Sequence, residues 1–96
     1  MNTQPTHEVR KHQIRGLGAT KTYTNNSTGH KVTVHPVQTY NDGSLKVFCE
    51  TNIDGQVRTR SKIFNSAQVS NKDEARGKTI AELLSIFTNH RYVYKP

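Results

Sequence analysis

Basic side chains and one aromatic side chain recur at every second position of two neighbouring segments in the middle of the chain. They are Lys46 and Phe48 in the first segment, and Arg58, Arg60 and Lys62 in the second. Residues two apart on a strand share a face. Guanidinium groups suit phosphates and guanine edges, and an exposed ring offers a stacking surface to an unpaired base. The spacing therefore predicts one sheet face that gathers these five residues and binds nucleic acid.

A plainer interpretation is that these side chains form the solvated face of an amphipathic sheet. Glu50 has the same parity as Lys46 and Phe48 and offsets part of the positive charge. Binding is favoured because Phe48 is expected to be exposed among charged groups, and because no acid interrupts residues 56–64.

The N-terminal region contains many basic and polar residues and few apolar ones. Arg10, Lys11 and Arg15 lie in it. This composition predicts a flexible basic arm over residues 1–19, followed by a single α+β domain over residues 20–96. Short basic arms contact phosphates or enter a minor groove. The alternative is a frayed terminus that happens to be basic.

Residues suited to catalysis are few. The chain has seven Asp and Glu residues, and turns or helix starts account for most of them. The five histidines are expected at the surface, where they add pH-dependent positive charge, since the few acids leave no carboxylate second shell to orient metal ligands. His30 and His35 have opposite parity and should point to opposite faces unless Pro36 introduces a bulge. We expect no enzymatic activity, no cofactor and no metal site.

The single cysteine, Cys49, has the parity of Leu45 and Val47 and is expected in the core as a small apolar residue. One cysteine cannot form an intramolecular disulfide or a structural zinc site, which favours a reducing, cytoplasmic location. Residues 1–15 contain no apolar signal region, and no apolar run is long enough to cross a membrane. We therefore expect no membrane association.

Fourteen Lys and Arg residues against seven Asp and Glu give a net charge of +7 on 96 residues. Only 31% of the residues are hydrophobic, so one small domain with a thin core is expected. A strongly positive surface attracts polyanions, whereas solubility alone is better served by acids. The thin core also leaves room for a homodimer, because a second copy would bury further surface.

The middle of the chain predicts four antiparallel strands in a meander. Short runs rich in Thr, Val and Tyr cover residues 21–24, 30–35, 45–51 and 56–64. Turn-forming residues separate these runs, and Asp54-Gly55 supplies the positive φ angles of a tight hairpin turn. Pro36 should end or bulge the second strand.

One convincing helix lies in the C-terminal third. Thr79 and Glu82 have capping-box spacing at the start of an apolar stripe, which predicts a main helix over about residues 79–88. An earlier start, capped by Ser70 with Asp73 three residues on, would place Gly77 inside the helix at about 1 kcal/mol relative to Ala. The main helix is expected to begin after Gly77, and a helical turn before it remains open.

The apolar stripe of this helix, Ile80, Leu83, Leu84 and Phe87, should pack on one face of the sheet. That face is expected to consist of Leu45, Val47, Cys49, Val57 and Ile63. The tail, residues 90–96, alternates aromatic and basic residues and predicts an edge strand with Tyr92 and Tyr94 on one side. The predicted fold is α+β: a small antiparallel sheet of three to five strands on one C-terminal helix.

Residues 45–87 resemble two families in which a three-stranded sheet precedes a helix. Residues 56–64 followed by Lys72-Asp73-Glu74-Ala75 are similar to the basic strand and helix start of the AP2-like arm-type DNA-binding domain of phage integrases. The same four residues are similar to the start of the final helix of the double-stranded RNA-binding domain. The resemblance is one of element order and implies a nucleic-acid-binding topology, without assigning the chain to either family.

These features predict a non-enzymatic nucleic-acid-binding module that uses a basic sheet face and an N-terminal arm. DNA and RNA, single-stranded and double-stranded, all remain open. The alternative is a small accessory protein of a phage or mobile element that binds and inhibits or redirects a host protein or ribonucleoprotein.

Overall fold

The computed structural model describes residues 6–17, 20–25 and 27–96, with the backbone alone at residues 15–17. Its elements, in chain order, are β1 (Thr6–Arg10), η1 (Lys11–Gln13), β2 (Ile14–Leu17), β3 (Thr20–Thr24), β4 (Lys31–Val34), β5 (Gln38–Thr39), β6 (Leu45–Ile53), β7 (Gln56–Phe64), α1 (Lys72–Phe87) and β8 (Arg91–Lys95). Strands β2, β3, β4, β6 and β7 follow one another in an antiparallel main sheet, and β5 also pairs with β6. Strands β1 and β8 pair in parallel and form a separate ribbon.

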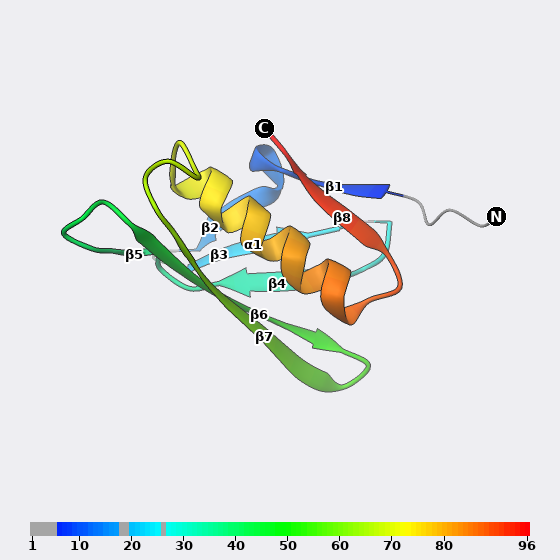
Figure 1. Cartoon of the computed structure of the whole chain (residues 1–96). Coiled ribbons are helices and arrows are strands. Elements are labelled where there is room, and N and C mark those ends of the chain that lie inside the picture. Colours follow the sequence, from blue (N-terminus) through cyan, green and yellow to red (C-terminus); the bar gives the residue numbers. More distant parts are fainter. Residues whose placement is uncertain (1–5, 18–19, 26) are drawn as a thin grey trace.

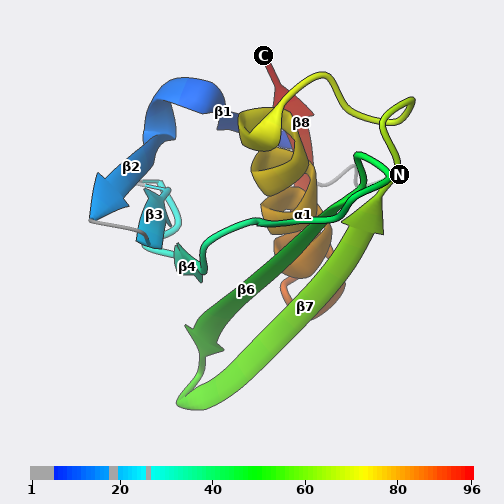
Figure 2. The same ribbon diagram turned by 90° about the vertical axis from the view of Figure 1, so that its left-hand side faces the viewer.

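Helix α1 lies between the curved main sheet and the β1–β8 ribbon (Figures 1 and 2). It packs on β6 and β7 on one side and on β8 and β1 on the other. The core between these layers consists of buried side chains that include Val9, Tyr23, Val47, Ile80 and Leu84. The predicted class, α+β with an antiparallel sheet on a C-terminal helix, is confirmed.

The predicted four-stranded meander is present as β3, β4, β6 and β7. Between the last two strands, Asp54 and Gly55 have φ angles of 52° and 81°, which form the expected tight turn. Between β4 and β5, residues 35–37 face only residues 47–48, because Val34 opposes Cys49 whereas Gln38 opposes Lys46. Three residues thus lie opposite two residues of β6, and the one extra residue forms the bulge expected at Pro36.

Helix α1 begins earlier than predicted. The side chain of Asn71 accepts a hydrogen bond from the Glu74 amide at 2.8 Å and caps the helix, so Gly77 lies in its middle. A Cβ atom at Gly77 would lie 2.0 Å from Cδ1 of Tyr94. The ring of Tyr94 occupies the space that a side chain at position 77 would need, so its packing on α1 requires a glycine there.

Residues 6–17, predicted as part of a flexible arm, lie instead in β1, η1 and β2. Val9 and Ile14 are buried in the core, and β1 hydrogen-bonds to the C-terminal strand β8 along its length. The burial of these two apolar residues and the pairing with β8 dock the segment, while Arg10 and Lys11 remain exposed. Residues 1–5 and 18–19 of the predicted arm lie outside the described part. The tail forms the expected strand, with β1 as its partner.

The predicted faces of the β6–β7 hairpin are wrong for β7. Because two residues form the turn, Ile53 opposes Gln56, and odd-numbered residues of β6 oppose even-numbered residues of β7. Directly opposed residues share a face. Arg58, Arg60 and Lys62 therefore lie on the α1 side with Val47 and Cys49. Val57 and Ile63, predicted in the core, lie on the other face and are 63% and 59% exposed.

Candidate functional site

Glu82 of α1 engages two of the three cations on β7. Arg60 donates to one of its carboxylate oxygens, and Lys62 Nζ lies 2.6 Å from the other. Hydrogen bonds from Lys62 and Arg60 hold the pKa of Glu82 below its ordinary value, although burial acts in the opposite direction. The Arg58 guanidinium lies 5.4 Å from the centre of the Phe87 ring. These cations brace β7 against α1, and the structure does not bring them together with Phe48.

The basic residues of the predicted arm lie elsewhere again. Arg10 ends β1 and pairs with Glu8, and Lys11 is exposed on η1. Arg15 lies within β2, and its side chain is outside the described part. Since the β1–β8 ribbon lies on the α1 side of the molecule, Arg10 and Lys11 are not neighbours of Lys46 and Phe48 (Figure 2).

The face of the main sheet turned away from α1 has no second layer of described residues over it, and we call it the open face (Figure 2). A row of directly opposed residues crosses it through Thr22, Thr33, Glu50 and Thr59, from β3 to β7. Lys46 and Phe48 lie on the same face of β6. The open face is therefore hydroxyl-rich at its centre and carries the predicted aromatic residue.

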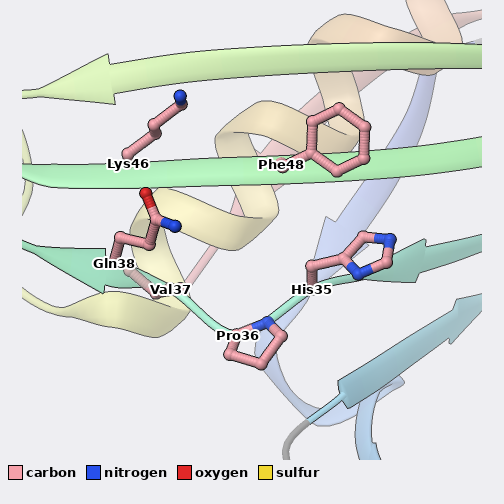
Figure 3. Close-up of a pocket in the computed structure, with 6 residues that line it drawn as sticks. All are labelled: His35, Pro36, Val37, Gln38, Lys46 and Phe48. Atoms are coloured by element: carbon pink, nitrogen blue, oxygen red, sulfur yellow. The ribbon is translucent and has the colours of Figure 1, made fainter.

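A hollow of about 410 Å³ lies on the open face beside the Pro36 bulge. Its lining residues are His35, Pro36, Val37, Gln38, Lys46 and Phe48. Figure 3 shows Lys46 and Phe48 projecting from β6 on the side opposite α1, with His35 and Gln38 on the adjacent segment that runs from β4 into β5. The extra residue of the bulge interrupts the pairing of this segment with β6 between Val34 and Gln38, which contributes to the hollow.

Polar and aromatic groups lie side by side in this hollow. Phe48 is 38% exposed, and its ring centre lies 5.1 Å from that of His35. His35 Nε2 lies 2.7 Å from Glu50 Oε1, so the one acid at this site is already engaged. Lys46 makes no ion pair with any other described residue. The site offers a stacking surface, the Gln38 amide and an uncompensated ammonium group.

A second cluster joins histidines from distant parts of the sequence, which the sequence did not predict. His7 Nε2 lies 3.1 Å from His90 Nδ1, and His30 Nδ1 lies 3.0 Å from the Tyr92 hydroxyl. Burial, followed by the neighbouring His90 and His7, lowers the pKa of His30. Within the described residues, no group of three or more His, Cys, Asp or Glu side chains is placed to hold a metal ion. The cluster ties the ribbon to the loop before β4.

Cys49 is buried, as predicted from its parity. Burial raises the pKa of its thiol to about 12, so the thiol stays protonated and poorly nucleophilic at neutral pH. Its role in the described structure is to fill the core between β6 and α1.

Comparison with known proteins finds no matching family model, no matching curated protein and no matching solved structure. In the part of the chain that the structure describes, no helix has the length and apolar character needed to cross a membrane.

Proposed function

We propose that this chain is a non-enzymatic nucleic-acid-binding protein, and that its open face receives an unpaired base on Phe48. The observation that carries the proposal is the hollow of about 410 Å³ that combines the Phe48 ring with Gln38 and Lys46. Stacking of a base on an aromatic side chain contributes about 1–3 kcal/mol. A glutamine amide can both donate to and accept from a base edge, and a lysine pairs with phosphate.

The charge of the molecule supports the same proposal. A net charge of +7 attracts a polyanion over a long range and speeds its encounter with the open face. Lys31 is exposed on the open face of β4, and neither it nor Lys46 forms an ion pair with another described residue. Phosphates on either side of a stacked base can approach these two cations.

Fluorescence anisotropy with a short single-stranded oligonucleotide, at two salt concentrations, tests the proposal. We expect binding that weakens as salt rises, because each neutralised phosphate releases counterion. A duplex of the same sequence should bind more weakly, since its bases are not free to stack on Phe48. Absence of binding at low salt, or a clear preference for the duplex, would contradict the proposal.

Phe87 provides a matched control for the aromatic site. It is 36% exposed, against 38% for Phe48, but lies on α1. We expect Phe48→Leu to weaken single-strand binding about tenfold, from the loss of stacking, and Phe87→Leu to leave it nearly unchanged. Equal effects of the two substitutions would exclude the Phe48 hollow as the site.

A further inference from the structure

The free edge of β7 is a second candidate binding surface, and its argument does not depend on the proposed function. β7 is nine residues long, and among the described strands it pairs only with β6. Figure 2 shows it at the margin of the main sheet, with no other described strand or helix beside its outer side. Residues 56–59, 61 and 63 are exposed. A long uncovered edge strand is a template for pairing with another extended chain.

The hairpin register determines which backbone groups point outward. In a two-residue hairpin the residues flanking the turn, here Ile53 and Gln56, form a hydrogen-bonded pair, and such pairs then alternate along the strands. The His35 amide donates to the Phe48 carbonyl at 3.0 Å, so the backbone groups of Phe48 point toward the chain that continues β4. The backbone groups of the next residue, Cys49, point toward β7, as this alternation requires. The residues with outward N–H and C=O groups are Val57, Thr59, Ser61 and Ile63.

The two sides of this edge differ in chemistry. On the α1 side, Arg60 and Lys62 share one acid, Glu82, and Arg58 forms no ion pair with another described residue, so the edge remains positively charged. Arg60 Nε is buried and has no hydrogen-bond partner among the described residues. On the open face, Val57 and Ile63 expose most of their apolar surface.

We propose that this edge binds an acidic, extended peptide segment of another protein as an added strand. The peptide backbone would pair with the outward groups of β7. Acidic side chains at alternate positions would meet Arg58, Arg60 and Lys62, and apolar side chains between them would cover Val57 and Ile63. Main-chain hydrogen bonds supply affinity in this mode of recognition, and the alternation of side chains supplies specificity.

Charge argues against a second copy of the chain as the occupant. A two-fold antiparallel pairing of β7 strands that covers Val57 with Ile63 of the second copy would place Arg60 opposite its own equivalent. It would also place Arg58 opposite Lys62. Like charges directly opposite one another destabilise a strand pair, whereas an acidic strand removes the repulsion.

Binding of labelled peptides in an anisotropy assay tests the proposal. The probe alternates Glu with Val, and its control has the same composition with the Glu residues grouped together. Only the alternating peptide can place all its acids on one side of an added strand. We expect it to bind more tightly than the grouped peptide, and we expect Arg58→Gln to weaken it. Equal binding of the two peptides would reduce the interaction to bulk charge and overturn the proposal.

Ser61→Pro tests the backbone pairing directly. Proline removes an N–H that points away from β6, and edge strands tolerate proline at such positions. We expect a folded variant whose affinity for the alternating peptide falls about three- to tenfold, the effect of one main-chain hydrogen bond. Ser61→Thr, the control, should bind normally.

An alternating peptide N-methylated at single positions gives the same information without altering the protein, should Ser61→Pro fail to fold. If neither Ser61→Pro nor N-methylation of the peptide weakens binding of the alternating peptide, the proposal is overturned. Sedimentation showing a dimer that Ser61→Pro dissociates would also overturn it, because the occupant would then be a second copy.

Discussion

The ring of Tyr94 lies against Gly77 so closely that the middle of α1 has no room for a side chain. Gly77→Ala raises helix propensity by about 1 kcal/mol, but overpacking at such a contact costs about 1–3 kcal/mol. We expect a net loss of stability in urea unfolding. In a Tyr94→Ala background, the same substitution should become neutral or stabilising. If Gly77→Ala stabilises the protein with Tyr94 present, the packing of β8 on α1 is not as described.

His30 makes stability depend on pH. Burial, His90 and His7 lower its folded-state pKa from 6.5, and the charge of Asp54 acts in the opposite direction. The unfolded chain therefore binds a proton more readily, and the stabilisation, complete above the unfolded pKa, is lost as pH falls from about 6.5 through the folded pKa.

We accordingly expect the thermal midpoint to fall between pH 7.5 and pH 5, and His30→Gln to reduce this fall. His12→Gln, on exposed η1, is the control that should not reduce it. An equal fall in the His30→Gln protein would assign the pH dependence to other groups.

Among the elements, β1 is the one whose role differs most from the prediction. Val9 is buried against the core, so Val9→Ala should cost roughly 2 kcal/mol of unfolding free energy. Lys11→Ala, on exposed η1, should cost much less. Urea denaturation of the two variants measures both effects. Equal stability of Val9→Ala and the unaltered protein would mean that β1 does not contribute to the folded core.

Local sequence signals predicted the elements well where neighbours in the chain pair with each other. Asp54-Gly55 located the β6–β7 turn, and alternation placed Cys49 inside and Phe48 outside. The same turn also fixes the pairing of odd with even positions, which the predicted grouping of Phe48 with Arg58 and Arg60 did not respect. The register was thus contained in the sequence.

Other features depend on residues far apart in the chain and have no local signature. The parallel pairing of β1 with β8 joins segments from opposite ends of the sequence. In the N-terminal segment itself, only the apolar residues Val9 and Ile14 indicate that it packs on the core. The close contact between Gly77 and the Tyr94 ring likewise joins residues of α1 and β8, so the sequence around Gly77 could not show why a glycine lies inside the helix. The hollow beside Phe48 requires both the Pro36 bulge and the pairing of β5 with β6.

Over the whole molecule, acids and bases are unevenly distributed. Three of the seven acids, Asp73, Glu74 and Glu82, lie on α1 and pair with Lys or Arg residues. On the open face, Glu50 pairs with His35 instead. Lys46, beside Phe48, therefore has no acidic partner among the described residues. In the proposed function, Lys46 is thus available to a phosphate next to the base on Phe48.

The most direct test of this account is an NMR titration of the ¹⁵N-labelled protein with a short single-stranded oligonucleotide at low salt. The largest amide shift changes are predicted at residues 35–38 and 46–50, around the Phe48 hollow. The β1–β8 ribbon and the α1-facing cations Arg58, Arg60 and Lys62 should change little. Changes concentrated on the ribbon or along β7, or no changes at all, would contradict the assignment of the open face as the nucleic-acid-binding surface.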